Sequence, residues 1–419
     1  MNTCFILLYQ LAIRLYGLAI RIGANFQAKA KLWITGRQHI FEKLTKAFET
    51  ETGAIIWMHC ASLGEFEQGR PLIERFKADY PAYKILLTFY SPSGYEIRKN
   101  YALADYVFYL PLDTPSNAKR FISIVQPKLV FFVKYEFWYF YLITLQQKKI
   151  PYYLIAGVFR PNQLFFKPYG KWYFKAIQGF EKIFLIDAPS LAIARKHDLQ
   201  QAILTGDPRI DRVAAIAKNA PPIHELQTFK GNKQLFILGS AHEQDWQVFF
   251  DFLKNIQTKD YFDQWRFMIA PHEITDTQLS KITEHSPLPV LRYTHCTTPQ
   301  PVAPSALFVL DTIGQLSAAY QYGDIAFIGG GFDTGIHNIL EPAAFGLPIL
   351  FGSTYHKFQE AKDLIEQGGA VVVLDVEGLV SIFEQWVVDA ERIGVGGVNW
   401  GYVGGNVGGT KNILRELSI

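Results

Sequence analysis

The chain has 419 residues, of which 49% are hydrophobic, 19% charged and 15% aromatic. This balance excludes long intrinsic disorder, and the length predicts two domains. The formal net charge of +3 is too small to indicate a nucleic-acid partner. The cysteines, Cys4, Cys60 and Cys296, lie far apart, so we expect neither a disulfide framework nor a zinc site.

The first 25 residues predict a membrane-directed helix. Residues 4–22 are almost wholly apolar and aromatic, interrupted mainly by Gln10, Arg14 and Arg21. The two arginines weaken a free-standing transmembrane span, and no signal-peptide cleavage site follows. We therefore expect an anchor or interfacial helix over residues 1–25, with a buried first helix as the alternative. The basic residues that follow predict that the rest of the chain lies in the cytoplasm.

Two series of short apolar runs alternate with segments of helical composition, a pattern typical of βα repeats around a parallel sheet. The first series comprises residues 54–58, 84–88, 106–110, 129–133, 151–156 and 182–186, and the second comprises 235–239, 266–270, 306–310, 325–328, 348–351 and 370–374. The predicted fold class is α/β, with two Rossmann-like domains facing a central cleft.

The domain boundary is predicted near Pro221, inside the turn-rich residues 217–233. The predicted domains are an amino-terminal domain over residues 26–220 and a carboxy-terminal domain over residues 221–400. Residues 394–409 predict a glycine-rich turn connection into a last helix. We expect residues 401–419 to pack back on the first domain.

The strongest constellation of residues is a strand that runs into Gly329, Gly330 and Gly331 and then into a predicted helix starting near residue 336. Glycines let a backbone approach a phosphate closely, and free N–H groups at a helix start favour an anion. Any tight strand-to-helix turn also uses glycines. The pattern His337-Asn338-x-x-Glu341-Pro is more specific, and Glu341 falls where it could bind ribose hydroxyls.

This block resembles the donor-site signature of the 3-deoxy-D-manno-octulosonate (Kdo) transferases. Other segments resemble motifs of that family in the same order: residues 57–65 (WMHCASLGE), 134–138 (KYEFW), 205–211 (TGDPRID) and 239–243 (GSAHE). The resemblance implies a GT-B fold and the transfer of Kdo from CMP-Kdo to a lipid A precursor.

Glu65 is the predicted general base, because the resemblance assigns the catalytic glutamate to that motif. An inverting transfer needs a base that takes the proton from the attacking hydroxyl. Ser62 and Glu65 also have the spacing of a helix capping box, which is a competing interpretation. The resemblance further implies Glu136 as a supporting acid and acceptor contacts from four residues: Ser62, Gly64, Lys134 and Trp138.

The aromatic residues 135–141 could form either core or a wall against the acceptor. Tyr139 and Phe140 stand where the family usually has proline and asparagine, so acceptor contacts could differ there.

The donor phosphate needs cationic partners, and Arg209 is the first candidate, at a position where the family usually has lysine. Ser240 and His272 complete the predicted donor site. The family usually has an arginine beside His272, and this chain has none. There is no Asp-x-Asp motif, so we expect no metal and no cofactor.

The sequence therefore predicts an inverting, metal-independent Kdo transferase that acts on lipid A precursor at the inner membrane. One alternative is a GT-B transferase or epimerase that uses a UDP-sugar. A second alternative is a catalytically degenerate, membrane-associated sugar-nucleotide-binding protein.

Overall fold

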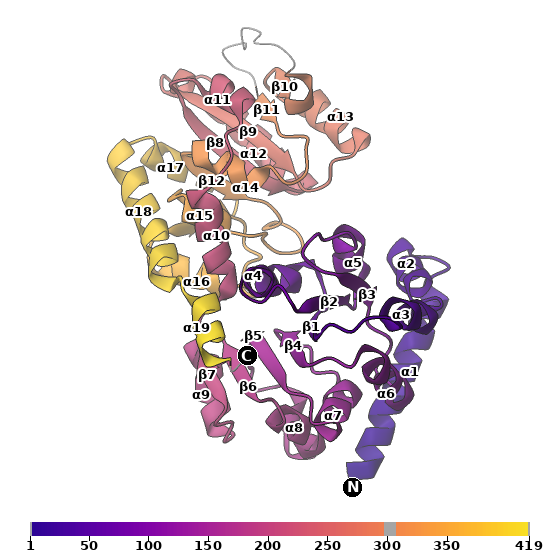
Figure 1. Cartoon of the computed structure of the whole chain (residues 1–419). Helices are drawn as coiled ribbons and strands as arrows, with labels where there is room; N and C mark the ends of the chain where they lie inside the picture. The colour runs from indigo at the N-terminus through magenta and orange to yellow at the C-terminus, as the bar shows by residue number, and fades with distance from the viewer. Residues whose placement is uncertain (1, 297–306, 418–419) are drawn as a thin grey trace. The chain divides into compact units, whose positions relative to one another are not determined.

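The computed structural model describes residues 2–296 and 307–417 (Figure 1). It divides into two compact units: unit 1 is Met1–Asp211 with Gly408–Ile419, and unit 2 is Arg212–Val407. Ala306, at the edge of a predicted strand, and the terminal residues 1, 418 and 419 lie outside the described residues.

Unit 1 contains a parallel sheet of seven strands in the order β3-β2-β1-β4-β5-β6-β7. The strands are β1 (Ile55–Cys60), β2 (Lys84–Phe89), β3 (Tyr106–Tyr109), β4 (Leu129–Val133), β5 (Tyr152–Gly157), β6 (Lys182–Leu185) and β7 (Ala202–Leu204). The order reverses between β1 and β4, as in a Rossmann-like sheet. The helices are α1 (Asn2–Gly23), α2 (Ala28–Gly36), α3 (Ile40–Phe48), α4 (Leu63–Asp79), α5 (Pro92–Arg98), α6 (Pro115–Val125), α7 (Tyr139–Gln147), α8 (Lys171–Gln178), α9 (Ala188–Lys196) and α19 (Gly409–Glu416). Helix α10 (Pro208–Lys218) begins in unit 1 and continues into unit 2.

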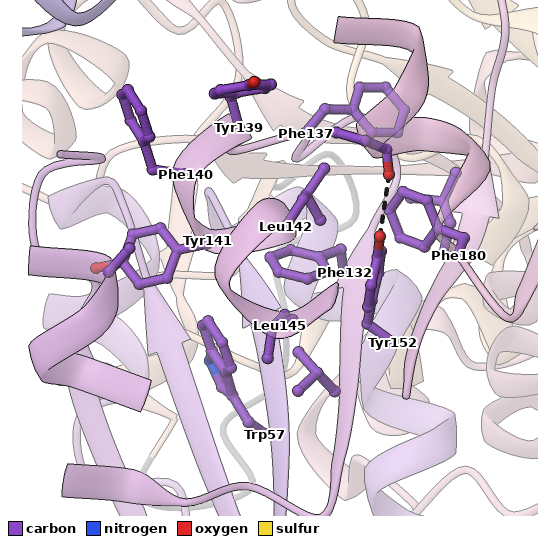
Figure 2. Close-up of a cluster of buried hydrophobic side chains, with 14 of the residues drawn as sticks. Trp57, Phe132, Phe137, Tyr139, Phe140, Tyr141, Leu142, Leu145, Tyr152 and Phe180 are labelled. Atoms are coloured by element: carbon purple, nitrogen blue, oxygen red, sulfur yellow. Dashed lines mark hydrogen bonds between the residues drawn. The ribbon is translucent and has the colours of Figure 1, made fainter. Parts of the chain in front are cut away.

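Both faces of this sheet are buried, which explains why its strands are apolar throughout. Side chains alternate between the faces of a strand. On β1, Ile56 and Met58 join a core that includes Phe66 of α4, and Trp57 joins the opposite core. Figure 2 shows the second core, where Tyr139, Tyr141 and Leu145 of α7 gather over the sheet. The predicted aromatic segment therefore contributes largely to the core.

Unit 2 contains a second parallel seven-stranded sheet, in the order β10-β11-β9-β8-β12-β13-β14. Its strands are β8 (Gln234–Ala241), β9 (Trp265–Pro271), β10 (Val290–Arg292), β11 (Leu307–Val309), β12 (Ile325–Ile328), β13 (Ile349–Phe351) and β14 (Ala370–Val372). Its helices are α11 (His224–Lys230), α12 (Glu243–Ile256), α13 (Asp276–His285), α14 (Leu316–Ala319), α15 (Leu340–Ala344), α16 (Gln359–Glu366), α17 (Val376–Trp386) and α18 (Asp389–Asn406).

The structure corrects the predicted linker. The units divide between Asp211 and Arg212, before the predicted boundary at Pro221. Helix α11 lies inside the turn-rich segment, buries Leu226 and Phe229, and belongs to unit 2. Burial of two apolar side chains outweighs the local turn signals.

The predicted turn connection over residues 394–409 is wrong, because most of it is helix α18. Glycine is a poor helix former, and tertiary contacts supply the missing stability. The buried Asn399 amide donates to the carbonyls of Leu347 and Gly369 at 2.6 and 2.7 Å. The short strands β7 and β10, three residues each, were also not predicted.

The last helix, α19, belongs to unit 1. Ile413 is fully buried in the core that contains Phe66, and Lys182 forms an ion pair with Glu416 at 2.7 Å. The Asp211 carboxylate accepts the N–H groups of Gly408 and Thr410 where the chain returns to this unit.

Candidate functional site

The predicted site residues follow the strands at which each sheet reverses its order. In unit 1 these strands are β1, followed by Glu65, and β4, followed by Glu136. In unit 2 they are β8, followed by His242, and β12, followed by the glycine loop. In open α/β sheets, ligands bind beyond the carboxyl ends of the strands at such points. Each unit therefore carries its own candidate half-site.

Glu65 is a buried carboxyl group at the start of α4, only 8% exposed. Its Oε2 accepts the N–H groups of Ala61 at 2.5 Å and Ser62 at 3.2 Å, so the capping box is present. Burial, followed by the negative charge of Glu136, raises the pKa of Glu65 to about 8. A general base works best when its pKa lies near the working pH, so the cap and the raised pKa are compatible with that role.

Glu136 lies in the turn after β4, and its side chain is 11% exposed. Its Oε2 accepts the indole N–H of Trp138 at 2.7 Å and lies 3.4 Å from His59 Nε2. These contacts fix the carboxylate in one orientation. Its negative charge adds to the effect of burial in raising the pKa of Glu65.

A buried chain of polar groups stands behind Glu136. Thr88 of β2 is the register partner of His59 on β1. Thr88 Oγ1 accepts the indole N–H of Trp57 at 2.7 Å and lies 2.9 Å from His59 Nδ1. The indole N–H of Trp138, which also donates to Glu136, donates to His59 Nε2 at 3.0 Å, so the imidazole proton is on Nδ1 and donates to Thr88 Oγ1. These hydrogen bonds connect Glu136 to side chains of β1 and β2.

The residues predicted to contact the acceptor surround this pair of carboxyl groups. Gly64 is exposed in the first turn of α4, and Ser62 is half-buried at its cap. The ammonium group of Lys134 lowers the pKa of Glu65, opposing the effect of burial. The half-buried Trp138 stacks on Tyr90 with ring centroids 4.4 Å apart. Their contact with an acceptor stays a prediction.

Arg209 lies at the start of α10 and belongs to unit 1. Its guanidinium group donates twice to the Asp207 carboxylate, at 2.9 and 2.6 Å. Part of its charge is therefore compensated within the protein, and its role toward a phosphate stays a prediction.

Three histidines gather at the carboxyl ends of neighbouring strands in unit 2. His242 follows β8, His272 follows β9, and His337 follows β12 and the glycine loop. Their rings stack with centroids 4.4 to 5.1 Å apart, and the Nε2 atoms of His242 and His337 are 2.9 Å apart. Burial, followed by His272 and His242, lowers the pKa of His337 to about 4.

The ligating nitrogens of these histidines all lie within 4.8 Å of one another, a spacing at which they could hold a metal ion or share an anion. The ring planes differ by only 11° to 26°, so the imidazoles lie side by side. A tetrahedral metal needs lone pairs that converge from well-separated directions. The three histidines are placed within reach of a common ligand, and the nature of that ligand stays a prediction.

The glycine loop differs from the predicted phosphate nest. The Gly329 N–H donates to the Gly239 carbonyl at 2.9 Å, and the Gly330 N–H donates to Asp245 Oδ2 at 2.7 Å. The predicted nest is therefore wrong for these two groups, which already have partners. Gly329 has a packing role instead, because a Cβ atom there would lie 2.3 Å from the Ser240 carbonyl oxygen.

The predicted helix after the glycine loop is also shorter than expected. Helix α15 starts at Leu340, not near Ile336, and spans five residues. So short a helix has little macrodipole to offer an anion. The side chains of the three histidines are therefore additional candidate anion partners at this sheet edge.

Glu341 is held by two polar neighbours in unit 2. Its Oε1 accepts the Asn338 amide at 3.0 Å, and its Oε2 accepts the Ser317 hydroxyl at 2.9 Å. The Asn338 carbonyl in turn accepts the Leu340 N–H at 3.1 Å. These bonds orient a carboxylate that could accept hydroxyl groups of a ribose, and that role stays a prediction.

Several residues of the two half-sites were not predicted. His59 and Thr88 lie inside otherwise apolar strands, and the only sequence signal for them is a polar residue within an apolar run. His242 lies in the motif at residues 239–243, but no role was predicted for it. The buried Asp245 stands three residues after His242, the spacing of a capping box, which is a local signal for its contact.

Two Rossmann-like units in one chain define the class of protein. The structure is similar to UDP-GlcNAc 2-epimerase from Neisseria meningitidis, with a TM-score of 0.60 and 14% identity over 86% of this chain and 98% of that one. It is also similar to MurG from Acinetobacter baumannii, with a TM-score of 0.52 and 11% identity over 87% and 98%. The fold is GT-B, as predicted.

Sequence comparison narrows the class to a family. Residues 37–212 match the family model described as 3-Deoxy-D-manno-octulosonic-acid transferase (kdotransferase). The chain is 26% identical over 340 residues to the 3-deoxy-D-manno-octulosonic acid transferase of Aquifex aeolicus, covering 79% of this chain and 86% of the relative. It is 27% identical over 341 residues to that of Haemophilus influenzae, covering 79% and 78%. Over most of its length the chain is similar to Kdo transferases, and the predicted resemblance is confirmed.

Proposed function

We propose that this protein transfers Kdo from CMP-Kdo to a hydroxyl group of a lipid A precursor, with inversion and without a metal ion. The observation that carries the proposal is Glu65, a buried carboxyl group with its pKa raised to about 8. It lies inside the region that matches the Kdo transferase model and at the strand end where a ligand is expected.

In the proposed reaction, the acceptor hydroxyl oxygen attacks the anomeric carbon of Kdo while Glu65 takes the hydroxyl proton. The bond from the anomeric carbon to the phosphate oxygen breaks, and cytidine monophosphate leaves from the opposite face. Glu65 Oε2 is held by two backbone N–H groups, so Oε1 is the atom that receives the proton. The fixed Glu136 raises the proton affinity of Glu65.

The donor is assigned to unit 2. The imidazoles of His242, His272 and His337 share the phosphate and take the place of the arginine that relatives have beside His272. Glu341, oriented by Asn338 and Ser317, accepts the ribose hydroxyls. Arg209 of unit 1 adds positive charge. Imidazoles carry a positive charge only when they are protonated, whereas an arginine is always protonated.

The assignment of the acceptor draws on the family and on helix α1. Residues Thr3–Gly23 form a helix that is long and apolar enough to cross a membrane by length and composition. A lipid-linked acceptor stays in the bilayer, so an enzyme held at the inner membrane, with its catalytic units in the cytoplasm, would meet it there.

The test is direct. Purified protein is incubated with lipid A precursor and CMP-Kdo in the presence of EDTA, and the molecular mass of the lipid is measured by mass spectrometry. We expect a gain of one or more Kdo residues. Parallel reactions with UDP-sugars are expected to give no gain and no epimerised sugar. Activity with a UDP-sugar alone, or no Kdo gain with an intact membrane-bound acceptor, would overturn the proposal.

A further inference from the structure

Helix α1 presents a continuous apolar ridge to solvent. Six aliphatic side chains at helical spacing are each at least half exposed: Leu7, Leu8, Leu11, Leu15, Leu18 and Ile22. A large exposed apolar patch on a protein surface indicates a site that contacts another apolar surface, such as a protein or a membrane. The ridge runs along the whole length of the helix, not at one end.

The opposite face of α1 is attached to unit 1. The Tyr9 hydroxyl donates to the fully buried carboxylate of Asp113 at 2.6 Å, and the Tyr9 ring packs against Trp172 and Tyr139. The same carboxylate accepts two N–H groups at the start of α7. One helical face is therefore held by the core of unit 1 along the first half of the helix.

The second half of α1 is also in close contact with the unit. At Gly17 the helix backbone approaches Leu112 so closely that a Cβ atom would lie 2.9 Å from Leu112 Cδ2. A helix that crossed the bilayer alone would have to leave both contacts and strand the buried Asp113. The structure instead keeps the axis of α1 against unit 1 with its apolar ridge turned outward.

Beside this ridge lies a cavity of about 420 Å³, framed by α1, α2, α3 and the segment that follows β3. Its lining combines apolar side chains with three arginines, Arg14, Arg21 and Arg37. Arg37 is fixed by bonds to the carbonyls of Trp33, Tyr90 and Leu110 and is covered by aromatic rings. Its charge sits permanently at the inner wall.

Arg14 and Arg21 differ from Arg37. They are exposed, stand seven residues apart on the same side of α1, and make no hydrogen bond or ion pair among the described residues. No acidic side chain lines the cavity. Three positive charges around an open, partly apolar cavity are complementary to an anion that is attached to an apolar body.

We propose that α1 lies in the plane of the membrane surface and that this cavity binds the phosphate of an anionic phospholipid headgroup. The leucine ridge enters the acyl-chain boundary, and Arg14 and Arg21 reach the phosphate layer beside it. The proposal does not depend on the reaction that unit 1 catalyses. It assigns a lipid site to α1 in place of a simple transmembrane anchor.

The first test measures binding of the full chain to sedimented vesicles of phosphatidylcholine with or without phosphatidylglycerol. The double variant Arg14→Gln/Arg21→Gln is compared with Arg195→Gln/Lys196→Gln on α9, which removes the same charge from an exposed site elsewhere in unit 1. We expect a tenfold to thirtyfold weaker binding to phosphatidylglycerol vesicles, roughly one factor of five per arginine, only in the first variant. Equal loss in both variants would overturn the headgroup site. Displacement by millimolar inorganic phosphate would also overturn it, in favour of a soluble anion.

The second test measures depth. Leu7→Cys, Leu15→Cys and Ile22→Cys each carry a fluorophore, and quenching by lipids labelled at different depths locates each position. A helix in the membrane plane places all three at one depth. A spanning helix would separate the first and last by about 22 Å, because each residue rises about 1.5 Å, and that result would overturn the proposal.

Discussion

The half-site in unit 1 is built from acidic side chains, whereas the half-site in unit 2 is built from histidine side chains. In unit 1, two carboxyl groups lie close together in a buried setting, and the pKa of Glu65 rises to about 8. In unit 2, three imidazoles lie close together, and the pKa of His337 falls to about 4. The pKa shifts therefore favour the uncharged form of Glu65 in unit 1 and of His337 in unit 2.

This difference suits the two units to different roles in the proposed reaction. A carboxylate whose pKa is raised is a stronger base. An imidazole whose pKa is lowered stays neutral until an anion binds beside it. In the proposed reaction, unit 1 takes the proton of the acceptor and unit 2 compensates the charge of the departing phosphate. The division predicts separable effects of mutations in the two units.

The largest expected effect is at Glu65. Glu65→Gln keeps the capping box, since glutamine can accept the same N–H groups, but it cannot take a proton. We expect kcat to fall by about 100-fold to 10,000-fold, the usual contribution of a general base. The exposed Glu42→Gln on α3 is the control and should keep full activity. Full activity of Glu65→Gln would remove Glu65 as the base.

The next effect is at His337. Anion binding favours a protonated imidazole, and the pKa of His337 is lowered to about 4, so affinity for cytidine monophosphate should rise as the pH falls from 7 toward 4. His337→Asn should weaken binding about 10-fold to 100-fold near pH 4, the value of a hydrogen bond to a charged group. It should also flatten the pH dependence. Calorimetry in buffers of different ionisation enthalpy would reveal proton uptake, and its absence would contradict an imidazole role.

A smaller effect is expected at Glu136. Its negative charge raises the pKa of Glu65, so Glu136→Gln lowers that pKa. The base form of Glu65 is the active one, so kcat rises with pH through about 8 in the native enzyme. In the variant this rise should move to lower pH by roughly one unit or more. An unchanged pH profile would show that the two carboxyl groups do not interact.

The smallest effect is on stability. Because the pKa of Glu65 is raised on folding, its contribution to stability is full below its unfolded value and is lost as the pH rises through about 8. Glu65→Gln removes this loss. The melting temperature of the variant relative to the native protein should therefore rise by a few degrees, about 2–8 °C, between pH 5 and pH 9. A constant difference would argue against the raised pKa.

Much of this division was predictable from sequence because strand ends and motifs are local. Apolar runs located most strands, and the position of Glu65 after the first strand followed from its motif. The clustering of His242, His272 and His337 was not predictable, because it depends on the order β9-β8-β12 in the sheet. The hydrogen bond from the Gly330 N–H to Asp245 was not predictable, because the two residues are 85 positions apart in the sequence.

The most direct measurement compares cytidine monophosphate affinity and Kdo turnover in the same two variants. Glu65→Gln should bind cytidine monophosphate as the native enzyme does and transfer almost no Kdo. His337→Asn should bind it more weakly, and its transfer should recover at high CMP-Kdo concentration. Equal loss of nucleotide affinity in both variants would contradict the division of roles between the two units.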